Sequence, residues 1–564
     1  MSLADWIVLI LTLLGIITYG LYKSRTSKDL EGYFLCNRMV PWYMVLLSIM
    51  GTQASAVTFL AAPGQAFTDG MRFVQYYFGL PLAMVVLCIT FVPVFHRLKI
   101  FTAYEFLEQR FDLKTRTLTS FLFLLQRGLS TGISISAPAI ILSSLLGWNI
   151  LWTNLFMGGL LIIYTVTGGA RAVAYTQQVQ LIIIFGGMFI AGYMVIHHLP
   201  ANIGWSEVLH IGGKAGKLNI ITTGIKANHF DWSDKYNLLS GVIGGFFLAL
   251  SYFGTDQSQV GRYLTARSLS ESRLGLLLNG LVKVPMQFLI LLLGVLVFSF
   301  YQFNREPVFF NQSQLDLLAH SKYKDSLTLL QKDYEAAQAV KVNEVNHLPV
   351  NGMNAQLQQA EDKSAASRAT VQRWLNDKEV KGDANDTNYI FLRFVTDYLP
   401  KGLVGLLIAV IFLAAWGSIA AALNSLASCT IVDFHKRFSR KELSAEKEYR
   451  LSRWYTLLWG VFCVLVAQLA YNIGNSLIEA VNVLGSLFYG VILGIFLVAF
   501  YRRRIGGRAV FISALLVEAG IILLFILNQR GIVPLSFLWL NVVGAIGVVI
   551  ISEIMQLLFS FNKE

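Results

Sequence analysis

The sequence has few charged residues for its length. Only 14% of its 564 residues are Asp, Glu, Lys or Arg, whereas 55% are hydrophobic and the mean hydropathy is +0.58. Soluble globular chains usually have about a quarter of their residues charged. The composition therefore excludes an ordinary soluble domain and indicates an integral membrane protein, for which the lipid bilayer is the solvent.

Cysteine is also rare, and its placement argues against a disulfide-stabilised extracellular fold. The four cysteines are Cys36, Cys88, Cys429 and Cys463. They lie in or beside apolar segments, none lies in a loop that we expect outside the cell, and no spacing is typical of a metal site. We therefore expect no disulfide and no metal cluster.

Recognisable catalytic sequences are absent as well. No H-E-x-x-H or G-x-S-x-G motif occurs in a suitable context, and the loops expected inside are too short for a catalytic domain, so we do not expect an enzyme. No channel filter is visible, and the few residues after the last apolar segment leave no room for a sensor's output domain. The first segment, 4–22, lacks the basic start and cleavage site of a signal peptide, so we expect a retained anchor.

Long apolar segments are abundant. Each is close to the roughly 20 residues that cross a bilayer as a helix. We count about thirteen: 4–22, 40–66, 73–95, 118–146, 150–166, 179–197, 238–252, 274–303, 402–432, 454–471, 477–500, 510–527 and 537–559. The pattern predicts an all-α, multi-pass protein of the plasma membrane, or of the inner membrane if the cell is bacterial.

Basic residues in the short loops predict the orientation. Arg97 and Lys99 follow the third segment, Arg262 and Arg267 follow the seventh, and an arginine run occupies 502–504. Lys and Arg collect on the cytoplasmic side of membrane proteins, so we expect the N-terminus outside and the C-terminus inside. The net charge of +12 then faces anionic lipid headgroups and needs no nucleic acid to explain it.

Two polar segments interrupt the apolar series, and both are expected outside. They are 200–237 and the longer 304–399. The composition of 325–339 and 355–377 is typical of polar amphipathic helices. A lid or a docking surface is one interpretation of the longer segment, and we favour a solvated insertion without a role in substrate binding.

Two of the apolar segments contain polar, glycine-bearing stretches at mid-membrane depth. These are 51–55, with the sequence GTQAS, and 254–257, with the sequence GTDQ. Helices are broken at this depth only where the freed backbone lines a cavity or is otherwise satisfied. A pair of interrupted helices in corresponding halves points to a transporter with its site at the repeat interface. Two ordinary kinked helices are the alternative.

Several motifs together resemble the sodium:solute symporter family. They are YFLCNRMVPW at 33–42, GGARAV at 168–173, Asp256-Gln257 with Arg262, and LNS at 423–425 with Asp433. The segments 55–60 and 102–111 are most similar to the branch with the multivitamin, monocarboxylate and iodide carriers. The resemblance implies a leucine-transporter-like fold, a five-plus-five inverted repeat that works by alternating access.

This fold implies a division of the chain. It comprises an extra helix and cytoplasmic loop (1–39), the first repeat (40–199), an extracellular loop (200–237), the start of the second repeat (238–303), the insertion (304–399), the rest of the second repeat (400–501) and two C-terminal helices (502–564).

The resemblance also implies a sodium site between the first and eighth core helices. Its ligands are the backbone carbonyls of Gly51, Ala54 and Ala414 and the hydroxyl of Ser418. Such oxygens suit a hard cation. This chain has Gly417 where the family often has a second hydroxyl, so water or a neighbouring group has to complete the site.

A second departure concerns the number of sodium ions. Relatives with an additional site use an aspartate on the fifth core helix and hydroxyls on the eighth, and this chain has Gln177, Ala420 and Ala421 there. We predict one coupling sodium per cycle.

Arg127 is the strongest substrate candidate, because a guanidinium in an apolar segment costs about 3 kcal/mol to insert and needs an anionic partner. Bacterial sialic-acid carriers of the family use an arginine in this helix for a carboxylate. Pairing with a protein carboxylate such as Asp256 is the alternative. The other substrate-binding candidates are Gln53, Thr58, Gln75, Tyr77, Asp256 and Gln257.

The functional prediction is sodium-coupled symport of a small organic solute, carrying a carboxylate or another anion. A sugar or polyol symporter is the alternative, and a channel or sensor is less consistent with the sequence. We expect Na⁺, the solute and the bilayer as partners, and no obligate protein partner.

Overall fold

The computed structural model is almost entirely helical. It describes residues 1–24, 30–201, 203–226, 228–347, 355–439, 444–469 and 477–561. Residues 25–29 of the predicted loop in 1–39 and residues 348–354 of the insertion lie outside the described residues. In the motif at 168–173, the side chains of 168–171 also lie outside them. All four cysteines are free and buried.

The membrane part is formed by elements on both sides of the insertion. Before it come α1 (Leu3–Ser24), α2 (Leu30–Leu35), η1 (Cys36–Arg38), α3 (Trp42–Gln53), α4 (Ala56–Asp69), η2 (Met71–Tyr77), α5 (Leu80–Ile89), α6 (Phe91–Leu98), α7 (Glu105–Arg110), α8 (Leu113–Leu146), α9 (Ile150–His197), α10 (Trp205–Lys214), β1 (Ile225–Lys226), β2 (His229–Phe230), η3 (Ser240–Gly244), α11 (Gly245–Thr255), α12 (Gln257–Tyr263) and α13 (Leu269–Phe303). After it come α18 (Leu403–Cys429), η5 (Thr430–His435), α19 (Lys436–Phe438), α20 (Ala445–Leu469), α21 (Leu477–Tyr501), α22 (Gly507–Gln529) and α23 (Phe537–Phe561).

The predicted apolar segments are helical, and the coarse membrane prediction is confirmed. Among the described residues, nine helices are long and apolar enough to cross a bilayer, and the bent pair α3 and α4 makes a tenth. Two shorter apolar helices, Ile150–Val166 and Ser240–Thr255, lie on other predicted segments.

α9 comprises two predicted segments and is not straight. Twelve residues along a straight helix span about 18 Å, yet the Tyr164 and Thr176 hydroxyls lie 3.0 Å apart. The helix axis therefore bends strongly between these residues.

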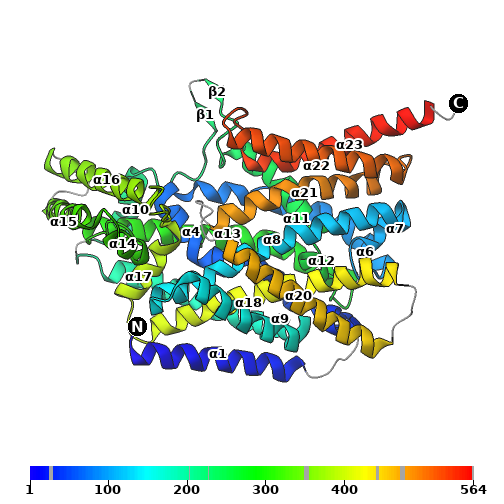
Figure 1. Cartoon of the computed structure of the whole chain (residues 1–564), viewed down its shortest axis with the longest axis horizontal. Coiled ribbons are helices and arrows are strands. Elements are labelled where there is room, and N and C mark those ends of the chain that lie inside the picture. Colours follow the sequence, from blue (N-terminus) through cyan, green and yellow to red (C-terminus); the bar gives the residue numbers. More distant parts are fainter. Residues whose placement is uncertain are drawn as a thin grey trace.

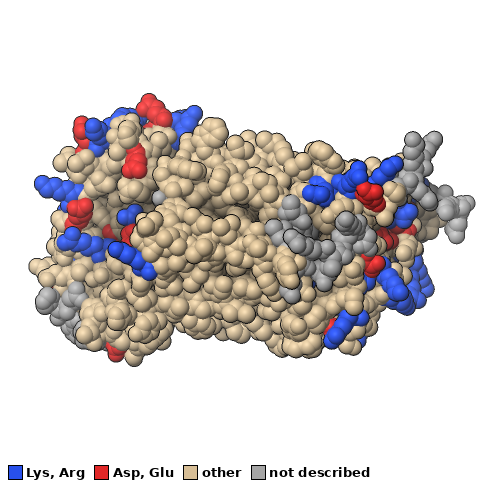
Figure 2. All heavy atoms as spheres, turned by 90° about the horizontal axis from the view of Figure 1, so that it is seen from below, with Lys and Arg blue, Asp and Glu red and all other residues tan. Residues whose placement is uncertain are grey.

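The charges mark a membrane-like band across the molecule. In Figure 2 the Lys, Arg, Asp and Glu side chains gather at the two ends, and uncharged surface fills the band between them. The two chain ends lie at opposite ends of the long axis, and the N-terminus shares its end with α14–α17 (Figure 1). The helices therefore run roughly perpendicular to the plane of the band, as transmembrane helices do.

The insertion is a helical module with its own small core. It contains α14 (Gln312–Ala319), α15 (Lys324–His347), α16 (Ala355–Leu375), η4 (Thr387–Tyr389) and α17 (Ile390–Tyr398). α15 and α16 correspond to the two helices expected from the sequence. Leu318, Val371 and Leu375 are among the residues of this core.

The insertion packs directly on α4, the second half of the broken helix. A β-carbon added to Gly64 of α4 would lie 1.9 Å from the Thr387 carbonyl oxygen of η4. Only glycine permits so close an approach of two backbones. The loop 200–237, which we expect outside the cell, contains a short hairpin of β1 and β2 that was not predicted from the sequence, with Ile225 opposite Phe230.

Candidate functional site

The predicted interruption in the second apolar segment is confirmed. α3 ends at Gln53, α4 begins at Ala56, and the two halves are bent by 58°. Ala54 has φ −82° and ψ 72°, outside the helical region. The last four carbonyls of a helix have no donor further along the same helix, and those of Met50 and Gln53 accept from Ala54 and Ser55. The Gly51 carbonyl belongs to the same set of helix-end acceptors.

α18 passes this break as a continuous, almost fully buried helix. Ala414, Gly417 and Ser418, the other three predicted sodium-site residues, lie in its middle. Ser418 donates a hydrogen bond to the Ala415 carbonyl at 3.0 Å, a local bond common for serine in helices, and its residue also lines the central cavity. The hydroxyl oxygen keeps lone pairs that are free to face a cation.

Gln177 of α9 connects the break to α18. Its side chain is fully buried and accepts from the Ser48 hydroxyl at 3.0 Å. Its amide nitrogen donates to the Thr52 hydroxyl at 3.3 Å and to the Gly417 carbonyl at 3.4 Å. One neutral amide therefore holds α3, α9 and α18 together next to the break.

The second predicted interruption is also confirmed. α11 ends at Thr255 and α12 begins at Gln257. Asp256 lies between them with extended backbone, and its carboxylate accepts from the Ser258 amide at 2.8 Å. It also accepts from the Tyr489 hydroxyl at 2.7 Å, so the aspartate caps the second half-helix and ties it to α21.

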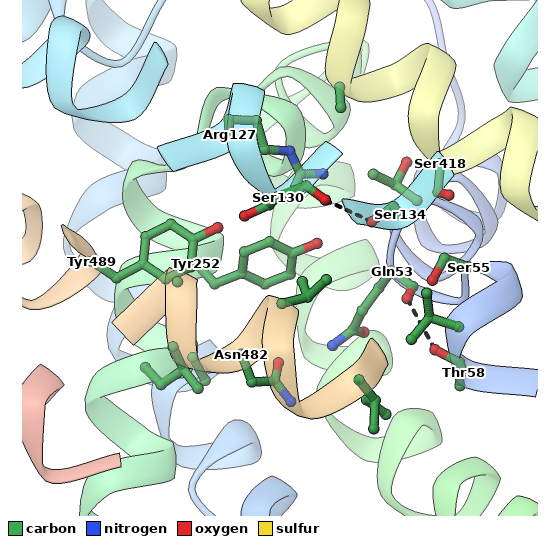
Figure 3. A pocket seen from close by; sticks show the side chains of 18 of the residues that line it. Gln53, Ser55, Thr58, Arg127, Ser130, Ser134, Tyr252, Ser418, Asn482 and Tyr489 are labelled. Atoms are coloured by element: carbon green, nitrogen blue, oxygen red, sulfur yellow. Dashed lines mark hydrogen bonds between the residues drawn. The ribbon is translucent and has the colours of Figure 1, made fainter. Parts of the chain in front are cut away.

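A cavity of about 140 Å³ lies between the two breaks. Figure 3 shows side chains entering it from the break between α3 and α4, from α8, α11, α18 and α21. The polar residues that line it include Thr52, Gln53, Ser55, Thr58, Tyr76, Tyr77, Gln126, Arg127, Ser130, Thr131, Ser134, Tyr252, Ser418, Asn482 and Tyr489. Most of these polar groups are hydroxyls and amides, and apolar side chains such as Leu248 and Ile478 line the rest of the cavity. Among the described residues that line it, Arg127 is the only charged one.

Arg127 faces both the cavity and Asp256. Its Nη1 lies 3.6 Å from Asp256 Oδ2, longer than the 2.7–2.9 Å of a charge-assisted hydrogen bond. Its Nε has no partner among the described residues, and its charged end lies 5.9 Å from the centre of the Tyr252 ring. The guanidinium is thus neutralised in part and retains donors for another acceptor.

The structure brings together only some of the predicted substrate residues. Gln53, Thr58, Tyr77 and Arg127 line the cavity. Gln75, Asp256 and Gln257 do not, and for these three the structure shows other contacts, described next.

Gln75 and Gln257 form connections within the protein. Gln75 donates to Thr222 and to the Tyr236 carbonyl at 3.0 and 3.1 Å. Gln257 accepts from the Ala103 amide at 3.0 Å and donates to the Phe101 carbonyl at 2.7 Å. Both amides satisfy buried backbone groups, which explains their burial without a ligand.

Several residues that line the cavity were not predicted from the sequence. Ser130 and Ser134 follow Arg127 at helical spacing on α8, so the helix period carried a usable signal for them. Asn482 and Tyr489 lie on α21, more than 200 residues after α11, and no local pattern indicates that they reach the cavity.

Comparison with known proteins agrees with this architecture. The model of the sodium:solute symporter family matches residues 33–313 and 370–516. The sodium/sialic acid symporter SiaT of Proteus mirabilis is 25% identical over 99% of this chain and 96% of its own length. The sodium/glucose cotransporter of Vibrio parahaemolyticus is 23% identical over 91% and 83%. A substrate-bound, outward-open structure of a Na⁺-coupled sialic acid symporter has the same fold, with a TM-score of 0.73, 23% identity, and coverage of 99% and 98%.

A helical membrane protein with a polar cavity between two broken helices is a secondary transporter by architecture. The family match extends over most of the chain. The protein belongs to the sodium:solute symporter family, so sodium is its coupling ion. The family resemblance seen in the sequence is thereby confirmed.

Proposed function

We propose that this protein imports a small organic anion together with sodium by alternating access. The observation that carries the proposal is Arg127, whose guanidinium lies in the cavity wall beside Tyr252, 3.6 Å from Asp256, with an Nε that has no partner among the described residues. A carboxylate placed in the cavity would supply the missing hydrogen-bond acceptor. The planar guanidinium suits such a group, because it offers paired donors.

The proposed topology has thirteen spans with the N-terminus outside and the C-terminus inside. The nine long apolar helices, the bent pair, the two shorter apolar helices and α8 support this number. The breaks in α3–α4 and α11–α12 fall at corresponding places of repeats spanning 40–199 and 238–501, with the insertion 304–399 inside the second. We propose the remaining division, with segments 1–39, 200–237 and 502–564, on the same basis.

The proposed sodium site lies where the end of α3 meets α18. The carbonyls of Gly51 and Ala54 belong to the break, where the backbone is freed from regular helix bonding. Ala414 adds a carbonyl and Ser418 a hydroxyl from α18. The C-terminal end of the half-helix α3 also carries partial negative charge, which favours a cation there.

A neutral sugar or polyol is the second candidate substrate. The observation that favours it is the Arg127–Asp256 pair, since the carboxylate offsets part of the positive charge that the solute meets. Gln53 and Asn482 supply amides to the cavity and Ser130 a hydroxyl. Groups of these kinds form hydrogen bonds with neutral polyols. The sodium/glucose cotransporter among the relatives shows that the family includes carriers of both kinds.

The test is substrate binding by the Arg127→Lys variant. If Arg127 binds an anion, the lysine keeps the charge but loses the paired donors, so the half-saturation concentration rises tenfold or more while the protein stays folded. Uptake of carboxylate solutes and of neutral sugars into proteoliposomes distinguishes the candidates. Arg393→Lys, at an exposed i,i+4 pair with Asp397, is the control.

The result that would defeat the anion proposal is tight binding of a neutral sugar with the same affinity in folded Arg127→Lys. A purely structural pair predicts a different outcome. Removing either Arg127 or Asp256 then lowers expression and stability equally, because each change leaves a buried charge alone.

A further inference from the structure

α18 has a gap beside the proposed sodium site, and a side chain of another helix occupies it. Gly417 has no side chain of its own. A β-carbon at this position would lie 3.1 Å from Gln180 Oε1, 3.3 Å from Gln177 Cγ and 3.5 Å from Gln177 Nε2. The atom closest to the place of the missing side chain is therefore an amide oxygen of α9.

Gln177 and Gln180, both on α9, differ in their hydrogen bonds. Gln177 accepts from Ser48 and donates to Thr52 and to the Gly417 carbonyl, so its amide is fully committed to joining the helices. Gln180 is one turn further along α9 and is 2% exposed. Its oxygen, not its nitrogen, is the end that approaches Gly417.

The chemistry of an amide oxygen matches the group that the site lacks. Sodium is a hard cation, and carbonyl oxygens of amides are typical ligands of hard cations, as hydroxyls are. The Gln177 amide nitrogen is a donor and repels a cation, which leaves Gln180 as the side chain of α9 that can contribute an oxygen at this gap.

We infer that Gln180 supplies the oxygen ligand that a hydroxyl at position 417 would otherwise provide. The sodium site then draws its ligands from three helices: α3, α18 and α9. The inference rests on the proposed sodium site at Gly51, Ala54, Ala414 and Ser418. It adds Gln180 as a sodium ligand and gives a reason for glycine at position 417.

The reason is steric and makes the two positions interdependent. Contacts of 3.1 Å to Gln180 and 3.3 Å to Gln177 are tighter than ordinary β-carbon contacts, so a serine at 417 requires the Gln180 amide to give way and the Gln177 side chain to shift slightly. Glycine at 417 with glutamine at 180 places one side-chain oxygen in this space, and serine at 417 with a short residue at 180 would do the same.

The experiment compares sodium affinity in Gln180→Leu, Gly417→Ser and the double variant Gly417→Ser/Gln180→Ala. Leucine keeps most of the glutamine volume and removes the oxygen. Two readouts are measured: the rise in melting temperature of purified protein with sodium against potassium, and the sodium dependence of uptake. Gln178→Leu on the same helix is the matched control.

The expected result for Gln180→Leu is a fivefold or greater rise in the half-saturating sodium concentration, with Gln178→Leu unchanged. The double variant should return to within about twofold to threefold of the parent, whereas Gly417→Ser alone should not. Gln180→Glu, which keeps the oxygen and adds a negative charge, should bind sodium at least as tightly as the parent. This comparison with the parent tests the inference if the leucine variant does not fold, and weaker sodium binding by folded Gln180→Glu contradicts it.

Unchanged sodium affinity in folded Gln180→Leu, or a double variant as weak as Gln180→Leu, overturns the inference. Failure of the proposed site itself is distinguishable. If Ser418→Ala loses sodium affinity while Gln180→Leu keeps it, the site stands without Gln180. If both variants keep it, the sodium site lies elsewhere.

Discussion

At the scale of single residues, Ser418 has the simplest proposed role. It is the one side-chain hydroxyl of α18 assigned to the sodium site, and it also lines the solute cavity. Ser418→Ala should therefore raise the half-saturating sodium concentration about tenfold or abolish sodium-dependent uptake, because the loss of one hard ligand weakens the site. Uptake by proteoliposomes over a range of sodium concentrations measures this.

Ser428→Ala is the control for that variant. Ser428 also donates to a carbonyl three residues earlier on α18, at 2.9 Å against 3.0 Å for Ser418, but it does not line the cavity. Loss of the local bond alone should affect both variants equally. Equal sodium affinity in Ser418→Ala and the parent, or full activity in potassium, contradicts the assignment.

At the scale of elements, the contact between α4 and η4 couples the broken helix to the insertion. Gly64→Ala places a methyl group against the Thr387 carbonyl, at a backbone that cannot move aside as a side chain does. We expect a loss of about 1–3 kcal/mol in the free energy of unfolding, seen as a lower melting temperature of the purified protein.

Gly159→Ala in α9 is the comparison, since a β-carbon there meets nothing within 4 Å. It should be neutral or slightly stabilising, because alanine is the better helix former. A melting temperature for Gly64→Ala equal to that of Gly159→Ala would show that η4 does not press on α4.

Within the insertion, Arg368 of α16 connects this helix with the stretch that directly follows α13. Its guanidinium lies 2.9 Å from Asp386 and 3.3 Å from Glu306. Burial raises the pKa of the Glu306 carboxyl, and the charge of Arg368 acts in the opposite direction. Loss of Arg368 would therefore remove the charge that favours the ionised form of Glu306.

Arg368→Met should loosen the insertion and cost about 1–3 kcal/mol, because two carboxylates lose their buried partner. The pKa of Glu306 then rises further in the folded state. A raised folded pKa means that stability falls as pH increases through it, so the loss should be larger at pH 8 than at pH 5. Hydrogen exchange of α15 and α16 at both pH values measures it.

Arg373→Met, an exposed arginine on the same helix, controls for the loss of a positive charge. Equal exchange in both variants, or a loss that does not grow with pH, would mean that Arg368 contributes only surface charge.

At the scale of the whole molecule, the coupling ratio is the quantity of interest. Gln177 carries no charge and presents amide hydrogens to Thr52 and Gly417, and Ala420 and Ala421 of α18 are fully buried without polar side chains. A second cation therefore lacks a carboxylate and hydroxyls there. We predict one sodium per solute.

Parallel sodium and solute fluxes into proteoliposomes measure the ratio, and the reversal potential of transport gives it independently. A ratio of two to one would show that this region holds a second ion through groups other than those of Gln177, Ala420 and Ala421.

The sequence by itself determined the membrane class, the helical segments, the two broken helices and the family. These features depend on local quantities, namely the length of an apolar run and the polar or glycine residues within it, which a chain carries wherever it folds. The interruptions at 51–55 and 254–257 appear in the structure at Ala54–Ser55 and at Asp256.

Only the tertiary structure decided which polar side chains reach the cavity. Gln75 and Gln257 are polar residues within apolar segments or beside them, as Gln53 is. In the structure, however, they form hydrogen bonds with backbone groups far away in the sequence. Asn482 reaches the cavity from α21, and Gln180 reaches Gly417 from α9. The helix period predicts which residues lie on the same face of a helix. What packs against that face depends on segments that are hundreds of residues apart in the sequence.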